Sequence, residues 1–354
     1  MNYFIIGYYA LLISASCLAA YYQKRTPFLL LFSLTLASFI MGIIGGEPAL
    51  WFVTVSAGFL ALAAGTSYAF REFLVILLPE NGAKVMRTAP LTAGFGLFVI
   101  MTYVIAGLFA PVIAPFGEAE VISSAFEPAN ETMLLGADQL GRDMFSRIIY
   151  GARNSVGLAL IATAIAFSVG AIAGLIAATK GGVFDQFMGR AVDVVMSIPS
   201  LIFALLLLSI FGTSAFTLVI VIGVIYSPRV FRLARAVAGN IVVMDYIEAA
   251  RLRGEGTWYL IRKEILPNSM APLIAEFGLE FCFVFLLIAG LSFLGLGIQP
   301  PTADWGSMVR ENATLISFGE ITPLLPAAAI ALLTVAVNFV VDWMLWIASG
   351  IKEV

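Results

Sequence analysis

The sequence has no histidine, only two cysteines and few charged residues. Without histidine, the commonest proton shuttle and transition-metal ligand is missing. Cys17 and Cys282 lie far apart, each inside an apolar segment, which favours packing over a metal site or a disulfide. No G-x-x-x-x-G-K-[ST] phosphate loop occurs, so we expect this chain not to bind nucleotide itself. These absences predict a chain with no catalytic residues, no cofactor and no metal, and nothing in it favours nucleic acid as a partner.

Apolar residues dominate what is present. Hydrophobic residues make up 61% of the 354 residues, charged residues 12%, and the mean hydropathy is +1.01. A hydrocarbon core about 30 Å thick needs about 20 apolar residues per helix. The apolar runs are continuous rather than alternating, which predicts helices instead of barrel strands and hence an all-α integral membrane protein. The predicted spans are 3–22, 28–46, 50–70, 93–115, 154–178, 196–212, 214–230, 272–297 and 323–348.

The basic residues predict an orientation. Most lysines and arginines fall in connections on one side, including the cluster from Arg229 to Lys263. By the positive-inside rule this side is cytoplasmic, so the N-terminus lies outside and the C-terminus inside. Of the 19 basic residues, the outer side receives only Arg142, Arg147, Arg153 and Arg310.

The connections divide the chain into three parts. Residues 1–70 hold about three closely spaced membrane helices, and the mixed, amphipathic segment 71–92 is expected to lie at the cytoplasmic interface. Residues 93–354 form a six-helix unit. Three of its connections are too long for simple turns, which indicates a function for them: two outer segments, 116–152 and 298–322, and a cytoplasmic loop, 231–271.

The cytoplasmic loop contains two predicted short helices. Residues Asp245 to Arg253 suit the first, with Asp245 as N-cap and Gly254 ending it at a positive φ. A second helix, Thr257 to Leu266, runs up to Pro267, where we expect the chain to turn into the membrane. The prediction is a helix, a tight turn and a helix at the cytoplasmic surface.

The same loop resembles a known motif. Glu248-Ala249-Ala250, then Gly254, then Leu266-Pro267 after a gap, is similar to the EAA loop of ABC-importer permeases. That resemblance implies that the loop docks into a cleft of a cytoplasmic ATPase, with Glu248 as its polar anchor. A solvated basic loop that merely obeys the positive-inside rule is the alternative interpretation. The implied coupling residues are Glu248, Ala249, Ala250, Arg251, Gly254, Leu266 and Pro267.

Two outer segments narrow the resemblance. LLGADQLGRDMFSRIIYGARNSV at 134–156 and LSFLGLGIQPPTADWGSMV at 291–309 resemble the dipeptide/oligopeptide/nickel class, in particular its second permease subunit. The resemblance implies a six-helix type I ABC importer permease core preceded by about three additional helices, in a bacterial or archaeal cell (inner) membrane. It also implies a homologous second permease subunit, two cytoplasmic ATPase subunits that bind ATP and Mg, and an extracytoplasmic substrate-binding protein.

Both outer segments are expected near the mouth of the pathway. Asp138, Arg142 and Asp143 lie around two glycines, which predicts a rigid turn with internal ion pairs. Contact with the binding protein and a structural role as gate or plug are both open. The residues concerned are Gly136, Asp138, Gly141, Arg142, Asp143, Gln299, Pro300, Asp304 and Trp305.

Ionisable residues inside membrane segments are functional candidates. Glu276 and Glu280 lie four residues apart on one face of a helix and are candidates for lining the pathway near the cytoplasm. Alternatively they pair with arginines of the basic cluster and fix helix packing. Asp193 and Asp342 complete this group, and structural pairing is the expected role of Asp342. Elsewhere, Gly170 and Gly174 are expected at a helix–helix contact.

The function predicted from the sequence is that of a permease subunit of an ATP-driven importer, forming half of a pathway for peptides or a similar small polar solute. Nickel complexes are an alternative cargo. The alternative function is a secondary transporter or channel that uses buried carboxylates, which predicts inverted repeats that the sequence does not show. A membrane enzyme has no evident catalytic group to support it.

Overall fold

The computed structural model describes residue 14, residue 33 and residues 48–348, and nearly all of its regular structure is helical. Its β structure among these residues is limited to two isolated bridges, Val121 with Arg142 and Ala137 with Asp143. The chain divides into two compact units, Met1–Ile100 and Met101–Val354. The all-α class predicted from the continuous apolar runs is thereby confirmed.

The first unit contains α3 (Pro48–Leu77), α4 (Glu80–Arg87) and the start of α5 (Leu91–Leu108). Buried Arg71 on α3 donates to the carbonyl of Ala89, at 3.2 Å, and so ties α3 to the turn after α4. The predicted span 50–70 lies within α3, which continues through the first part of the predicted interfacial segment. The predicted spans 3–22 and 28–46 lie outside the described residues.

The second unit is a bundle of long helices with short helices at both ends. Within the described residues, five helices are long and apolar enough to cross a membrane, or six if one bent pair counts as a single span. The elements after α5 are α6 (Ala110–Ile113), α7 (Met144–Gly151), η1 (Ala152–Val156), α8 (Gly157–Lys180), α9 (Gly182–Met196), α10 (Ser200–Phe211), α11 (Ala215–Val242), α12 (Asp245–Leu252), α13 (Thr257–Tyr259), η2 (Leu260–Ile265), α14 (Leu266–Phe293), α15 (Trp305–Asn312), η3 (Ala313–Phe318) and α16 (Leu324–Ala348).

The bent pair accounts for the predicted span 196–212. Its apolar part, α10, has 12 residues, which cover only about 18 Å at 1.5 Å per residue. The preceding α9 meets it at an angle of 83° across residues 197–199. Pro199 lies just before α10, and a proline disfavours a helical conformation at the residue before it, so the break falls where the sequence places Ile198-Pro199.

Close packing of α8 against α11 forms the centre of the second unit. A Cβ on Gly174 would lie 2.6 Å from the carbonyl oxygen of Phe231, and one on Gly170 would collide with the carbonyl of Ser227. Small residues let two membrane helices approach at backbone distance. The helix–helix contact predicted for the two glycines is confirmed.

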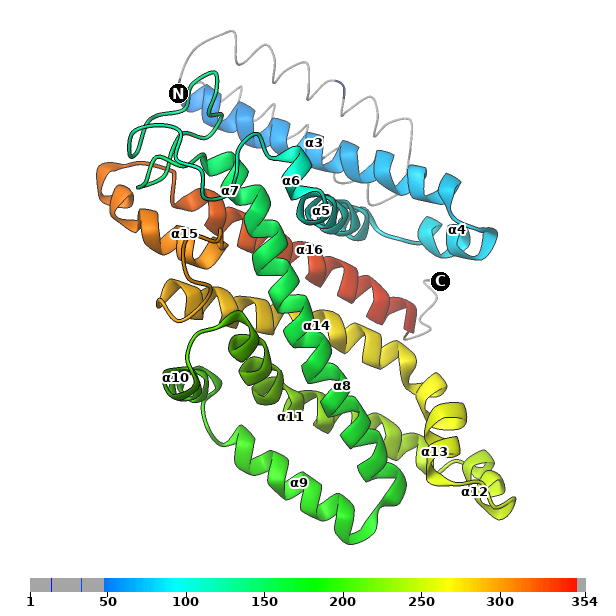
Figure 1. Ribbon diagram of the computed structural model, residues 1–354. Helices are drawn as coiled ribbons and strands as arrows, with labels where there is room; N and C mark the ends of the chain where they lie inside the picture. The colour runs from blue at the N-terminus through cyan, green and yellow to red at the C-terminus, as the bar shows by residue number, and fades with distance from the viewer. Residues whose placement is uncertain (1–13, 15–32, 34–47, 349–354) are drawn as a thin grey trace. The chain divides into compact units, whose positions relative to one another are not determined.

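Figure 1 shows how the short elements are distributed along the bundle. The helices α8, α11 and α14 run side by side, with α7 and α15 at one end and α12 and α13 at the other. The second unit therefore presents two separate candidate sites, one at each end of the same three helices.

Several predicted boundaries differ from those observed. Helix α11 continues to Val242 instead of ending near 230, and the helix that contains the predicted span 154–178 begins at Met144. The predicted loop 231–271 is therefore mostly helical. Charged residues such as Arg232 and Arg235 marked the expected end of the apolar stretch, but a helix can extend beyond the lipid without a change in its backbone.

Candidate functional site

The short helix α12 and the turn that follows it form the first candidate site. Gly254 has φ +84°, its N–H donates to Arg251 O at 2.9 Å, and the N–H of Glu255 donates to Ala250 O at 3.2 Å. This pair of bonds is a Schellman motif, which requires a left-handed residue after the helix and strongly favours glycine there. The positive φ predicted for Gly254 is confirmed.

Helix α12 is fixed to the bundle by an apolar cluster. Ile247 and Ala250 are fully buried and pack against residues of three other elements. Arg251 adds a polar contact, because its guanidinium donates to the carbonyl of Thr179, at 3.2 Å, near the C-terminus of α8. A cation there also interacts favourably with the helix dipole. The remaining buried members of the cluster are Leu175 of α8, Ala238 of α11, and Leu260, Ile261 and Ile265 of η2.

The opposite face of α12 is exposed and partly apolar. Glu248, Ala249 and Leu252 are exposed there, Leu252 by 82%, and Trp258 of the following α13 exposes 62% of its surface. Of the two alanines in the motif, only Ala249 is accessible, because Ala250 packs inside the chain. Large apolar side chains exposed in a connection between membrane helices are typical of a protein–protein contact. The basic loop of the alternative interpretation would need no such side chains.

Two local predictions for this site are wrong. Asp245 is the first helical residue instead of the N-cap, which is Met244 and forms no side-chain cap. The chain does not turn at Pro267, because one helical path runs from Thr257 to Phe293. The π-helical turn η2 precedes Pro267, and its wider hydrogen-bond spacing lets the helix pass a residue that has no N–H. Leu266 is half-buried against the apolar cluster and Pro267 is exposed.

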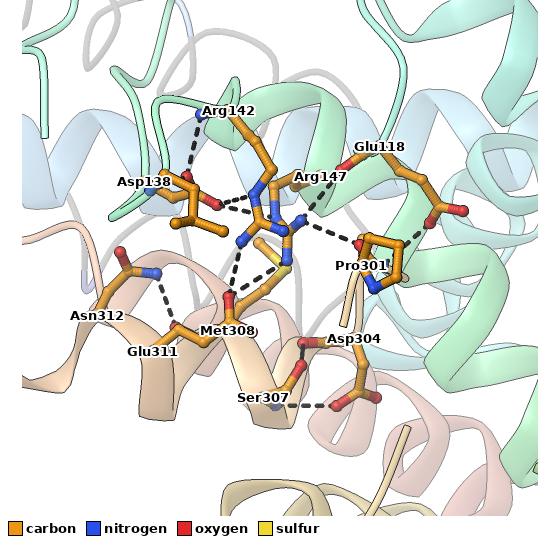
Figure 2. Close-up of polar contacts among 12 residues, drawn as sticks. Glu118, Asp138, Arg142, Arg147, Pro301, Asp304, Ser307, Met308, Glu311 and Asn312 are labelled. Carbon is orange, nitrogen blue, oxygen red and sulfur yellow. Dashed lines mark hydrogen bonds and ion pairs between the residues drawn. The ribbon is translucent and has the colours of Figure 1, made fainter. Parts of the chain in front are cut away.

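The second candidate site lies at the other end and is a buried ion cluster. Arg142 Nε lies 2.7 Å from Asp138 Oδ2, and Arg147 Nε lies 3.3 Å from the same oxygen. Both guanidinium groups also reach Glu311, at 3.0 and 3.4 Å. Figure 2 shows the two arginines between the two carboxylates. The cluster joins the outer segment to α15 across more than 160 residues of sequence.

Glycine geometry positions this cluster. Gly136 and Gly141 have φ of +74° and +76°, and a Cβ on Gly136 would lie 2.8 Å from Glu127 O. Asp143 caps α7 by accepting from the backbone N–H of Ser146, at 2.8 Å. The rigid turn with an internal ion pair predicted for this segment is confirmed, with Asp143 acting as a helix cap rather than as an ion-pair partner.

The second outer segment is bonded to the first. Asp304 caps α15 and also accepts from Ser155 Oγ, at 2.8 Å. The indole of Trp305 is fully buried and donates to Ile148 O at 2.9 Å. The two stretches that carry the sequence resemblance thus form one packed unit.

Most candidates for contact with a binding protein are therefore internal. Gln299 and Pro300 are exposed, although the Gln299 amide donates to Gly297 O at 2.9 Å. The other seven are buried, so their side chains shape the outer surface without forming it: Gly136, Asp138, Gly141, Arg142, Asp143, Asp304 and Trp305.

Three residues of this cluster, Arg147, Glu118 and Glu311, were not identified from the sequence as site candidates. Arg147 is fully buried, and its guanidinium also donates to Glu118 O at 3.0 Å. The Glu118 carboxylate accepts from Asn154 and from the backbone of Ala303, each at 3.0 Å. The spacing of Asp143 and Arg147 could have marked one helix face. Nothing local in the sequence links them to Glu118 or Glu311.

The intramembrane carboxylates differ from one another. Glu280 on α14 is 1% exposed, Glu276 is half-buried, and Asp193 and Asp342 are exposed. Within the described residues, no arginine lies within 4 Å of either α14 glutamate, and Arg235 is paired with Asp185 instead. Direct ion pairing with the arginine cluster, the structural alternative for Glu276 and Glu280, is thus not observed there. Cys282 is buried, as expected for a packing residue.

Comparison with known proteins identifies the family. Residues 170–348 match the family described as binding-protein-dependent transport system inner membrane component. The chain is 36% identical to a di/tripeptide transport system permease protein of Pseudomonas aeruginosa over 70% of this chain and 84% of that protein. It is 32% identical to a probable D,D-dipeptide transport system permease protein of Escherichia coli over 74% of this chain and 89% of that protein.

These findings decide between the functions considered above. A secondary transporter and a membrane enzyme give way to a multi-pass, non-catalytic transport component that works with ATPase and substrate-binding partners. The chain belongs to the family of binding-protein-dependent transport system inner membrane components and is a permease subunit of an ABC importer.

Proposed function

We propose that this permease subunit imports peptides and that a homologous but different permease subunit forms the other half of its pathway. Relatives that align over most of their length are named as permeases for di/tripeptides and dipeptides. The signature stretches at 134–156 and 291–309 support the same class. A pathway formed between two six-helix cores requires a partner of similar design.

The coupling element of this subunit is α12 with Gly254 and α13. The observation that carries the proposal is that α12 has one face buried against α8, α11 and η2 and another face exposed with Glu248 and Leu252, while Trp258 of α13 is exposed as well. An ATPase that closes on nucleotide can move membrane helices only through a rigid contact. In this proposal the exposed face docks on the ATPase, and the buried cluster transmits its movement to the long helices.

The proposal assigns the remaining partners to the two ends of the bundle. Two cytoplasmic ATPase subunits bind ATP and Mg and contact the α12 end, and the extracytoplasmic binding protein docks on the α15 end. The subunit lies in the bacterial or archaeal cell (inner) membrane with its N-terminus outside and its C-terminus in the cytoplasm, as the distribution of basic residues favours. The rigid ion cluster around Arg142 and Arg147 shapes the surface that meets the binding protein.

The test is purification of the tagged chain from its native membrane in mild detergent, followed by identification of bound proteins and reconstitution into vesicles. We expect a second permease and P-loop ATPases to co-purify. Vesicles that contain the complex and are supplied with its binding protein should take up labelled di- and tripeptides only when ATP is present on the side of the membrane where the ATPase subunits lie. ATP-driven uptake of another solute, with no uptake of peptides, would refute the cargo assignment but leave the importer assignment intact.

A further inference from the structure

Helices α11 and α14 carry a layer of polar groups at one level of the bundle. The hydroxyl of Tyr226 on α11 donates to the carbonyl of Phe283 on α14, at 3.3 Å, and fixes the two helices at this level. Arg229 lies one turn from Tyr226, and Glu280 one turn from Phe283. The layer therefore joins an arginine and a carboxylate from two different membrane helices.

This layer lies inside the depth of a bilayer. Arg229 is 14 residues from the first residue of α11, and Glu280 is 13 residues from the last residue of α14. At 1.5 Å per residue both are about 20 Å from the same end of the bundle, within a hydrocarbon core of about 30 Å. Both residues thus lie at a depth where charged groups normally face protein or water.

Arg229 is exposed on the surface of this chain. Its guanidinium lies 4.3 Å from the ring centre of Phe283, which is itself 46% exposed, and 5.9 Å from that of Tyr226. In the described part of the chain, no carboxylate lies within 4 Å of it. Because an arginine at this depth is unfavourable against lipid, the surface around Arg229 faces a water-filled path or another protein.

The other arginines of α11 are engaged differently. Arg235 forms a two-pronged pair with Asp185 of α9, and Arg232 contacts the sulfur of Met196. Both contacts tie α11 to the preceding bent pair of helices. Arg229 alone among these three rests on an aromatic surface with its hydrogen-bonding edge unoccupied in the described structure.

Two carboxylates lie behind Arg229 without bonding to it. Glu280 is 1% exposed, and neither of its carboxylate oxygens has a hydrogen-bond partner among the described residues. Both Glu280 and half-buried Glu276 interact electrostatically with Arg229. The N–H groups of Arg229 stay available to a ligand because no carboxylate of the described residues bonds to them.

A guanidinium with free donors fits one class of ligand best. Its planar fork matches the two oxygens of a carboxylate, and it stays charged in a membrane environment. We propose that Arg229 lines the translocation pathway and binds the carboxylate of the cargo in transit, with Phe283 supporting its guanidinium. This inference rests on the proposed function, since a peptide carries a C-terminal carboxylate. Glu276 lines the same surface, whereas buried Glu280 acts on the cargo only through Arg229.

The first test asks whether Arg229 faces water in the assembled complex. In a chain with C17A and C282A, we expect R229C to react with a membrane-impermeant thiol reagent. Fully buried Leu218 on the same helix and exposed Val243, just after α11, provide the matched controls, as L218C and V243C. Labelling of V243C without labelling of R229C would place Arg229 against protein or lipid and overturn the proposal.

The second test separates cargo binding from a structural role. The reconstituted complex receives a labelled peptide with a free C-terminus or the same peptide as its C-terminal amide. We expect R229Q to lower uptake of the free acid about tenfold or more, because the charge-assisted hydrogen bonds between the guanidinium and the peptide carboxylate are lost. Uptake of the amide should stay unchanged. R232Q, on the same helix, should preserve the discrimination of the wild type.

The binding protein is identical in every reaction, so a change in discrimination belongs to the permease. Equal loss of both peptides in R229Q, or no loss of either, would overturn the role of Arg229. A wild-type complex that takes up neither peptide would instead overturn the peptide cargo, and the labelling of R229C would still report separately whether this surface lines a pathway.

Discussion

Gly254 is the residue on which the end of α12 depends most directly. A Cβ at Gly254 and one at Gly256 would each meet open space, but only Gly254 has a positive φ, +84° against −78°. A β-branched residue in the left-handed region costs about 1–2 kcal/mol. We therefore expect Gly254→Val to break the Schellman turn and to uncouple ATP hydrolysis from uptake, while the protein still inserts and assembles.

Gly256→Val is the matched control, because it adds the same side chain two residues away at an ordinary φ. Peptide uptake and ATP hydrolysis are measured together in the reconstituted complex. Coupled uptake in Gly254→Val at the wild-type rate would count against α12 as the element that transmits movement.

Arg147 is the residue whose loss should most weaken the outer end. It is fully buried against Asp138 and Glu311. Removing one partner of a buried ion pair leaves uncompensated charge and costs about 3–5 kcal/mol. We expect Arg147→Ala to lower the thermal stability of the purified subunit by several degrees or to prevent its accumulation.

The exposed pair of Glu80 and Lys84, 2.9 Å apart, supplies the comparison. Such pairs contribute about 0–1 kcal/mol, so Lys84→Ala should leave the melting temperature almost unchanged. Equal effects of the two substitutions would mean that the cluster around Arg147 is solvated in the assembled protein.

The close contact between α8 and α11 holds these two helices of the bundle together. Gly174 faces the Phe231 carbonyl and the Ala234 side chain, whose atoms would lie 2.6 and 2.9 Å from an added Cβ. Overpacking of such a contact costs about 1–3 kcal/mol. Gly174→Val should therefore separate the two helices and lower the yield of correctly folded subunit. This is measured by size-exclusion chromatography.

Gly239 lies on α11 at a position where an added Cβ meets nothing within 4 Å. Gly239→Val introduces the same helix-interior substitution without the close approach, and it should fold normally. If both variants lost folded protein to the same degree, valine in a helix, rather than the α8–α11 contact, would be responsible.

The helices themselves could be predicted from the sequence because a run of apolar residues fixes both the class and the depth of a membrane segment. Their ends could not. Arg232 and Arg235 marked the limit of lipid, but α11 continues to Val242 because the backbone hydrogen bonds of a helix are formed within the helix and can continue beyond the lipid. Pro267 indicated a turn, and η2 absorbs it instead.

The two candidate sites also contain features that could be predicted from the sequence and features that could not. Gly254 could be predicted because one local turn fixes its φ. The partners of Arg147 could not, because Glu118 and Glu311 come from segments distant in the sequence. The polar layer at Arg229 was also missed as a layer, since it depends on the register of α11 against α14.

The orientation of the whole molecule in the membrane is the last matter that experiment can decide. The α12 end and the outer segment lie at opposite ends of the bundle (Figure 1). Val243, just before α12, and Leu134 expose 79% and 65% of their surface at these two places. In a background of C17A and C282A, we expect L134C to react with an impermeant thiol reagent added to intact cells. V243C should react only after the membrane is permeabilised, because the basic residues around it favour the cytoplasm. Both positions are exposed, so a difference in their labelling reports the side of the membrane that each one faces. Reversed labelling would place α12 outside the cell, where no ATPase can reach it, and would refute both the orientation and the coupling role proposed for α12.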